Sequence, residues 1–378
     1  MNEYDPGAAR RSGPPADPST GIVPSGQPLV GPAAGREADV ARGSAGERVR
    51  DRTSGRPLSH DDYRAAVRSR MADLDRLSPL PAGAGRPVSV ASGSDGAPDP
   101  AAELVPDERL IVALDVDGTI LDVNGRVSER MMAALTRMRA YGARIVISTG
   151  RGIEAALPVA RHVGLTDGWM ICANGAITLR MDPAAPRGYE VADSVTFDPS
   201  DVIAALSSAV PDGIIAVEAL DGGFRVSRPF PDGELIEDQR VVPPQEMGSE
   251  PVTRVVLRAP GMAVEEFSAL VAGCGLYSVE YAIGWTAWLD VAPEGVTKAS
   301  ALRALAARLG TGAERVVAVG DGANDIEMIR WAGVGAVMGS APRAVRDCGD
   351  LVTGPVWHDG CAALLDAVVE RTRRRSQS

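Results

Sequence analysis

The chain has 378 residues, a formal net charge of −11 at pH 7 and a sequence pI of about 4.9, and 45% of its residues are hydrophobic. This composition predicts a water-soluble protein with a sizeable core, and its acidity disfavours nucleic acid as a general partner. Its apolar runs fall short of the roughly 18 residues that a membrane-spanning helix needs, and its N-terminal residues are unlike a signal peptide, so we expect no membrane association and a cytoplasmic location.

Residues 1–106 are rich in Pro, Gly, Ala and Ser and poor in aromatic residues. Such a segment cannot bury enough apolar area to offset its chain entropy, so we predict a mostly disordered tail. One helical pattern interrupts it at 59–77, where apolar side chains recur at helical spacing behind a Ser59 cap: Tyr63, Val67, Met71 and Leu74. This segment is interpreted either as a transient or packed surface helix or as a docking element for a protein partner.

From residue 107 onward, short apolar runs alternate with helical patterns. The runs predict strands at 110–116, 143–149, 169–174, 315–321, 334–339 and 350–354. Fully apolar strands that alternate with helices are typical of a parallel sheet covered on both faces. We therefore predict an α/β fold with a Rossmann-like parallel-sheet core.

A different pattern occupies residues 182–293. Helices are expected at 199–209 and 262–273, each followed or preceded by two or more short strands, which indicates a mixed sheet inserted into the parallel one. The predicted organisation is therefore a tail at 1–106, a catalytic core formed by 107–181 and 294–372, and an inserted α+β cap domain at 182–293.

Acidic residues follow two of the predicted core strands. Asp115 and Asp117 end the first strand, and Asp321 and Asp325 follow a later one, at the carboxyl ends where functional atoms gather in parallel sheets. Strand alternation would place Asp115 and Asp117 on one side, which is unfavourable unless a cation lies between them. Carboxylates without histidine or thiol partners make a hard oxygen site, which suits Mg²⁺.

The cysteines and histidines do not offer another metal site. The chain has 4 cysteines and 3 histidines, and their spacing matches neither a zinc site nor a disulfide framework. The cysteines are Cys172, Cys274, Cys348 and Cys361. A reducing compartment is the environment that this pattern favours.

A site of this charge repels anions, so a bound phosphate needs donors from the protein. Thr149 and Gly150 at the end of the second strand can supply a hydroxyl and a backbone N–H. Lys298, the only lysine of the chain, can supply an ammonium. In isolation the STGR stretch at 148–151 is more often an ordinary strand-to-helix turn, and its meaning depends on the other elements.

Together these stretches are similar to a known set of motifs. DVDGTIL (115–121), STGR (148–151), ANGA (173–176), the lysine of GVTKASAL and GDGANDIEM (320–328) resemble the haloacid dehalogenase (HAD) superfamily, within it the Cof-type branch with a C2-type cap between the second and third motifs. The resemblance implies a Mg²⁺-dependent phosphatase that hydrolyses a small phosphorylated metabolite through an aspartyl-phosphate.

The resemblance also implies a role for each matched residue. Asp115 would be the nucleophile and Asp117 the general acid and base. Mg²⁺ would be held by the Asp115 and Asp321 carboxylates and the backbone carbonyl of Asp117, with Asp325 acting indirectly. The residues expected to bind the phosphoryl oxygens are Thr149, Gly150, Lys298 and Asn324.

Other residues are weaker candidates. Asn174 and Arg151 are expected at the mouth of the site. The cap residues proposed for substrate selection, on composition alone, are Glu218, Arg225, Arg228, Tyr281, Trp285 and Trp288. A compact ammonium at Lys298 fits between a carboxylate and a phosphoryl oxygen, where the wide planar fork of arginine does not.

Two alternatives to the phosphatase remain open from the sequence. A phosphosugar mutase of the phosphomannomutase type would return the phosphoryl group to the sugar. A catalytically silent regulatory module would use the same fold without turnover, although a degenerate site would usually have lost at least one of the matched residues.

Overall fold

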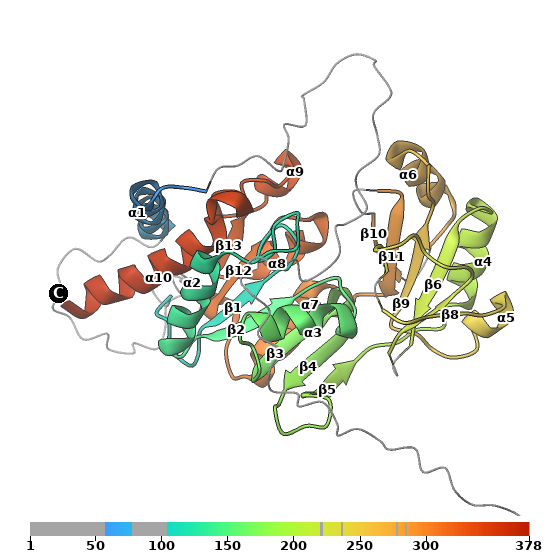
Figure 1. Cartoon of the computed structure of the whole chain (residues 1–378), viewed down its shortest axis with the longest axis horizontal. Helices are drawn as coiled ribbons and strands as arrows, with labels where there is room; N and C mark the ends of the chain where they lie inside the picture. The colour runs from blue at the N-terminus through green and yellow to red at the C-terminus, as the bar shows by residue number, and fades with distance from the viewer. Residues whose placement is uncertain are drawn as a thin grey trace, which may run out of the picture.

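The computed structural model describes residues 57–77, 104–219, 222–235, 237–276, 279–283 and 286–377. The predicted disordered tail lies outside the described residues at 1–56 and 78–103. The described chain forms two sheets in two adjoining lobes, an 8-stranded sheet in the core lobe and a 6-stranded sheet in the second lobe (Figure 1).

The core sheet has the strand order β14-β13-β12-β1-β2-β3-β4-β5. Its first six strands in this order are parallel, and β4 and β5 add an antiparallel hairpin. β1 is buried along its whole length, which is why its sequence is a continuous apolar run. The strands are β1 (Ile111–Leu114), β2 (Arg144–Ser148), β3 (Gly168–Cys172), β4 (Ile177–Met181), β5 (Tyr189–Ser194), β12 (Val316–Gly320), β13 (Val334–Val337) and β14 (Leu351–Val352).

Helices cover both faces of the core sheet, as the sequence predicts. One face packs against α2 (Glu129–Ala140), α3 (Ile153–His162) and α10 (Gly360–Gln377). The other face packs against α7 (Lys298–Arg308) and α8 (Ile326–Trp331). A short α9 (Arg343–Arg346) precedes β14. None of the described helices has the length and apolar content to cross a bilayer.

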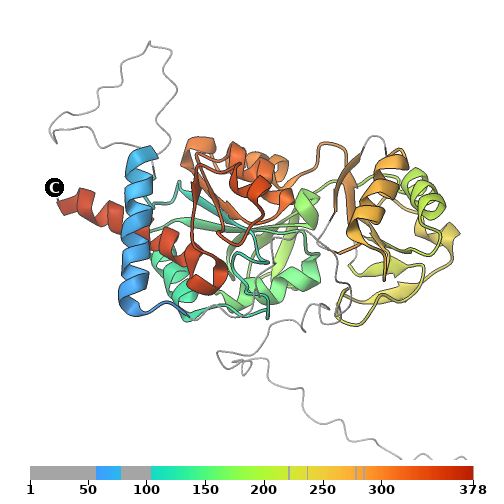
Figure 2. The same ribbon diagram turned by 90° about the horizontal axis from the view of Figure 1, so that it is seen from above.

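The predicted helix before the core is confirmed as α1 (His60–Leu77), and it packs across α10 (Figure 2). Its buried side chains are those of the predicted apolar stripe: Tyr63, Val67, Met71 and Leu74. The Tyr63 hydroxyl donates to Asp366 Oδ2 at 2.7 Å, and Arg137 on α2 pairs with the same carboxylate at 2.7 Å. The apolar face of α1, which the sequence offers as a docking surface for a protein partner, therefore packs against the core.

The second lobe consists of the elements from α4 to β11, with the strand order β10-β11-β9-β6-β7-β8. Its strands are β6 (Ile214–Glu218), β7 (Phe224–Val226), β8 (Gln239–Val241), β9 (Arg254–Arg258), β10 (Val279–Ile283) and β11 (Trp288–Pro293). α4 (Ser200–Ala209) and α6 (Val264–Gly273) pack on the outer face of this sheet, with a short α5 (Pro244–Met247) nearby (Figure 1). The opposite, inner face of the sheet is turned towards the core lobe.

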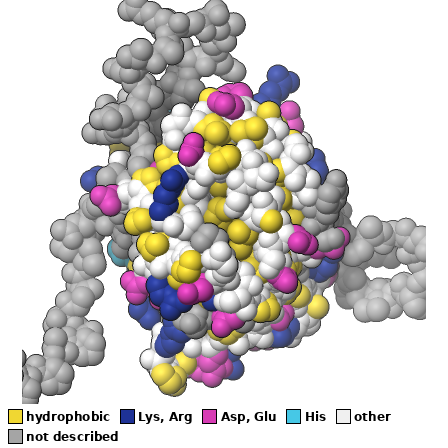
Figure 3. Space-filling model, turned by 90° about the vertical axis from the view of Figure 1, so that its right-hand side faces the viewer, with side chains coloured by type: hydrophobic (Ala, Val, Ile, Leu, Met, Phe, Trp, Pro, Cys, Tyr) yellow, Lys and Arg dark blue, Asp and Glu magenta, His cyan; other side chains and the backbone are white. Residues whose placement is uncertain are grey.

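The outer side of the second lobe carries acidic and basic side chains interspersed with hydrophobic ones (Figure 3). On its inner face, strand alternation places three charged side chains on the same side as Ala216 and Val256. These are Glu218 on β6, Arg254 on β9 and Asp290 on β11. The inner face therefore carries charged groups on the side that is turned towards the core.

Two elements differ from the sequence expectations. The predicted cap boundary at residue 182 lies too early, because β5 pairs with β4 in the core sheet. β5 is an edge strand whose residues are mostly exposed, so it lacks the apolar run that marks the other core strands. β8 was not predicted for the same reason, since its three residues are exposed.

The packing of α1 leads to a stability prediction. Replacing Leu74, which is 0% exposed, with alanine should lower the free energy of unfolding by about 2–5 kcal/mol, because the lost side chain leaves a cavity between α1 and α10. Leu77→Ala, at a position 37% exposed on the same helix, is the matched control and should change it by less than about 0.5 kcal/mol. Equal midpoints in urea for both variants would show that α1 does not pack on the core.

Candidate active site

The site lies where the strand order of the core sheet reverses. The chain passes from β1 to β2 to β3 on one side, and β12 pairs with β1 on the other. In open α/β sheets a crevice opens at such a point, outside the carboxyl ends of the strands. Asp115 follows β1 and Asp321 follows β12, so both predicted acidic stretches meet there.

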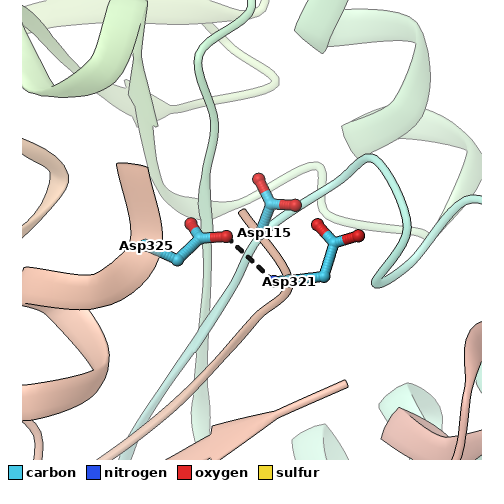
Figure 4. Close-up of side chains that lie close together, drawn as sticks. All are labelled: Asp115, Asp321 and Asp325. Carbon is cyan, nitrogen blue, oxygen red and sulfur yellow. Dashed lines mark hydrogen bonds between the residues drawn. The ribbon is translucent and has the colours of Figure 1, made fainter. Parts of the chain in front are cut away.

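Three carboxylates converge at this point, from Asp115, Asp321 and Asp325 (Figure 4). Each offers an oxygen that lies within 4.8 Å of the others. Lys298 Nζ lies 2.7 Å from Asp115 Oδ1 and 2.7 Å from Asp325 Oδ1. Its side chain is fully buried, so the one lysine of the chain bridges two strand ends in the interior.

The backbone around β12 orients these carboxylates. Asp325 Oδ2 accepts the N–H groups of Asp321 at 3.0 Å and Gly322 at 2.9 Å, which holds the turn after the strand (Figure 4). Gly118 has φ +83 and lies against the Asp321 carboxylate, where a Cβ would overlap Asp321 Oδ2. A glycine is therefore required in the Asp-Gly turn both for its backbone conformation and for the approach of Asp321.

The N-terminus of α7 positions Lys298. Thr297 caps this helix through a capping box with Ser300, so Lys298 is the first helical residue. Gly175, with φ +109, packs on the carbonyl of Thr297 where a Cβ would overlap it. The ANGA stretch thus brings the beginning of α7 close to the sheet.

Burial shifts the protonation of this cluster. Burial lowers the pKa of the Lys298 ammonium, but the carboxylates of Asp115 and Asp325 outweigh this effect, and the pKa lies above the usual lysine value. Burial also raises the pKa of Asp115, and the charge of Asp325 adds to the rise while Lys298 opposes it. A further cation beside Asp115 would stabilise its charged form.

The donor set fits a hard divalent cation. Three carboxylates against one ammonium leave two negative charges, and all the candidate ligand atoms are oxygens. Asp325 is engaged by Lys298 and by two backbone N–H groups, so Asp115 and Asp321 are the carboxylates best placed to bind a metal directly. Mg²⁺ prefers one or two carboxylates completed by water and substrate oxygens.

The Asp117 carboxylate is not one of the three that make up this cluster. Arg151 binds its carboxylate with two hydrogen bonds, from Nε to Oδ2 at 2.8 Å and from Nη2 to Oδ1 at 2.5 Å. The structure thus pairs the Asp117 carboxylate with Arg151, and the expectation that a cation lies between the carboxylates of Asp115 and Asp117 stays a prediction. Strand β1 ends at Leu114, so the alternation on which that expectation depended stops before Asp117.

The second motif forms a tight loop beside the cluster. The N–H of Arg151 donates to Thr149 Oγ1 at 3.1 Å, and the Thr149 side chain faces the interior at 1% exposure. A Cβ on Gly150 would lie 3.0 Å from Asn174 Oδ1, and Asn324 Nδ2 donates to that same oxygen at 2.9 Å. The structure thus links Gly150, Asn174 and Asn324, which come from three separate motifs.

The candidates in the second lobe divide into two groups. Glu218 and Trp288 are on or near its inner face, and Glu218 lies against Gly152 of the core. Arg225 pairs with Glu250 at 3.3 Å and Arg228 donates to the carbonyl of Asp212, so both are engaged within the lobe. Trp285 and the side chain of Tyr281 lie outside the described residues.

The sequence reasoning did not identify the charged residues that accompany Glu218 at the contact between the lobes. These are Arg254, Glu237 and Asp290. Arg254 and Asp290 lie on strands that resemble ordinary half-buried strands, and Glu237 lies in the loop before β8. The signal that could have singled them out is a charged side chain at an inward position of an otherwise apolar strand.

Comparison with known proteins places the chain in a family. The family model for haloacid dehalogenase-like hydrolases matches residues 112–209 and 263–365. A 5-amino-6-(5-phospho-D-ribitylamino)uracil phosphatase, YitU, of Bacillus subtilis is 25% identical over 68% of this chain and 96% of its own length. A phosphoglycolate phosphatase of Halobacterium salinarum is 27% identical over 68% of this chain and 96% of its own length.

Solved structures share the fold. A haloacid dehalogenase-like hydrolase from Bacteroides thetaiotaomicron aligns with a TM-score of 0.58 at 21% identity, over 68% of this chain and 99% of that one. A HAD subclass IIB sugar phosphatase aligns with a TM-score of 0.58 at 23% identity, over 68% of this chain and 98% of that one. The chain therefore belongs to the haloacid dehalogenase-like hydrolase family, as an enzyme of the phosphatase type.

Proposed function

We propose that this hydrolase is a Mg²⁺-dependent phosphatase that cleaves a small phosphorylated metabolite through an aspartyl-phosphate on Asp115. The observation that carries the proposal is the cluster of Asp115, Asp321 and Asp325 around a buried Lys298, at the switch point of a parallel sheet. A nucleophilic carboxylate beside an ammonium and a cation site meets the needs of phosphoryl transfer.

Asp115 is the nucleophile in this proposal. Its carboxylate oxygen forms a bond to phosphorus while the bond from phosphorus to the alcohol oxygen of the substrate breaks. Two anions must approach for this step, so the repulsion between them has to be offset. The Lys298 ammonium, 2.7 Å from Asp115 Oδ1, offsets it, and a bound Mg²⁺ would add further positive charge.

Asp117 is the general acid and base. As a carboxylic acid it gives its proton to the leaving alkoxide, and as a carboxylate it then takes a proton from the water that hydrolyses the aspartyl-phosphate. Its side chain is 61% exposed, which supports a position where substrate and water can reach it. The two hydrogen bonds from Arg151 restrict the orientation of this carboxylate.

The phosphoryl oxygens are held by the Thr149 hydroxyl, the Gly150 N–H, Lys298 and the Asn324 amide. Mg²⁺ would be held by the carboxylates of Asp115 and Asp321 with the backbone carbonyl of Asp117, while Asp325 orients Lys298 and the turn after β12. The substrate is a small phosphorylated metabolite, as the names of the phosphatase relatives suggest by analogy. Residues 195–293 act as the cap that selects it.

Replacing the nucleophile gives the first test. Asp115→Asn should abolish release of inorganic phosphate from an aryl phosphate and from a panel of phosphorylated metabolites, because an amide does not form the phospho-intermediate. The assay is run with Mg²⁺ on wild type and variant at matched thermal stability. Unchanged turnover in the variant would refute the assignment, and isomerisation of a phosphosugar without phosphate release would favour the mutase alternative.

Lys298→Arg tests whether size as well as charge is needed. It should lower turnover at least about tenfold, equivalent to roughly 1.4 kcal/mol of barrier, because the guanidinium is too wide for the space between Asp115 and Asp325. The control is Arg303→Lys, the opposite exchange at an exposed position of α7, which should change turnover by less than about twofold. Wild-type turnover in Lys298→Arg would contradict the role of the ammonium.

Metal dependence is tested by removal and titration. EDTA should abolish turnover, and Mg²⁺ should restore it. Asp321→Asn should raise the Mg²⁺ dissociation constant at least about tenfold, measured by calorimetry without substrate, because one of the two direct carboxylates is lost. Asp347→Asn, which removes an exposed carboxylate on the surface, should leave Mg²⁺ binding unchanged. Equal affinities in the two variants would place the metal elsewhere.

A further inference from the structure

Arg254 of the second lobe reaches into the second motif of the core. Its Nη1 donates to the carbonyl oxygen of Gly150 at 2.6 Å, across 104 positions of sequence. Gly150 belongs to the loop that is proposed to hold phosphate. A side chain of the lobe that covers the site is therefore bonded to the backbone of that loop.

The surroundings of Arg254 hold it in one position. Nε donates to Glu218 Oε2 at 3.0 Å, and Nη1 also contacts Asp290 Oδ1 at 3.2 Å. Trp288 Nε1 in turn donates to Asp290 Oδ2 at 2.9 Å, and the guanidinium lies 5.2 Å from the centre of the Phe224 ring. A buried arginine with several fixed partners cannot adopt many rotamers, so its hydrogen bond to the core is directional.

The lobes also meet closely next to this bond. A Cβ on Gly152 would overlap Glu218 Oε1 and would lie 2.8 Å from Glu237 Oε1. Gly152 stands before the first residue of α3, so the two carboxylates approach the positive end of that helix. The contact with Arg254 is thus one part of a wider polar contact with the same loop.

The bond from Arg254 acts on the peptide group that joins Gly150 to Arg151. A trans peptide is planar, and its C=O and N–H point in opposite directions. When Arg254 holds the Gly150 carbonyl, the Arg151 N–H is directed away from it, and the structure shows this N–H donating to Thr149 Oγ1 at 3.1 Å. A hydroxyl that accepts such a bond retains its own proton for donation to another acceptor.

We infer that Arg254 is a positioning residue that couples the second lobe to phosphate binding through the Gly150–Arg151 peptide and the Thr149 hydroxyl. The inference rests on the proposed phosphatase function. With the lobe in contact, the hydroxyl proton of Thr149 is directed to a phosphoryl oxygen. Without the Arg254 bond the peptide can rotate, and Thr149 loses the partner that sets its orientation.

The same loop carries the proposed acid and base. Arg151 donates its backbone N–H to Thr149 and its guanidinium to Asp117. The backbone nitrogen of Arg151 belongs to the Gly150–Arg151 peptide. Fixing this peptide therefore also restricts the Arg151 side chain, which orients Asp117. Contact with the second lobe would in this way position both the group that donates to phosphate and the group that donates the proton.

A double-mutant cycle tests the coupling. Arg254→Lys retains a charge for Glu218 and Asp290, but the lysine side chain is one bond shorter and should lose Gly150. It should lower kcat/KM for an aryl phosphate with Mg²⁺ about tenfold and weaken inorganic phosphate binding similarly. In a Thr149→Val background, Arg254→Lys should lower kcat/KM by less than about twofold, because the hydroxyl that Arg254 helps to orient is absent.

The control is Arg258→Lys at the other end of β9. Arg258 pairs with Glu234 at 2.6 Å inside the second lobe. Arg258→Lys should change kcat/KM by less than about twofold, both in the wild type and in the Thr149→Val variant. If the loss of kcat/KM in the double variant equals the product of the losses in Arg254→Lys and Thr149→Val, the two residues act independently and the coupling is refuted. If Arg254→Lys does not fold, the triple variant Arg254→Gln, Glu218→Gln and Asp290→Asn removes both ion pairs together with their partners and enters the same cycle.

The outcomes separate the two proposals. Wild-type protein that neither hydrolyses aryl phosphate with Mg²⁺ nor binds inorganic phosphate would refute the phosphatase proposal itself. Wild-type protein that binds phosphate, together with Arg254→Lys that binds it equally well, would refute the coupling and leave the phosphatase proposal intact. Coupled losses in the cycle support the inference.

Discussion

The pairing of one buried ammonium with two buried carboxylates is the constraint around which this site is built. Charges removed from water are stable only when partners compensate them, and Lys298 lies 2.7 Å from both Asp115 and Asp325. The compensation is incomplete once Asp321 is included, so the cluster retains negative charge that suits a divalent cation. The start of α7 and the close approach of Gly175 place the ammonium where this balance needs it.

The second lobe is connected to this site by polar contacts. Arg254 donates to the Gly150 carbonyl, and Glu218 approaches Gly152, so the lobe meets the loop that carries Thr149. Hydrogen bonds of this kind depend on direction and distance, and they are lost when the lobe moves by a small amount. Such a contact makes the geometry of this loop depend on the position of the second lobe.

The sequence was most informative about buried parallel strands, because an apolar run bounded by acidic or glycine-rich turns shows them directly. It was less informative at the edges of the sheets, where β5 and β8 are exposed and lack that signal. In the site it identified Asp115 and Asp321 from their places after β1 and β12. It did not show that Asp117 pairs with Arg151, because the strand ends before Asp117 and alternation no longer applies there.

By itself the sequence determined which groups are present and in what order, since each motif is a short local stretch whose chemistry can be recognised without its neighbours. The tertiary structure decided which of these groups meet. The bond from Arg254 to Gly150 spans 104 positions, and that between Asn324 and Asn174 spans 150. Contacts of this range depend on strand order and on the packing of two lobes, and no local pattern of residues encodes them.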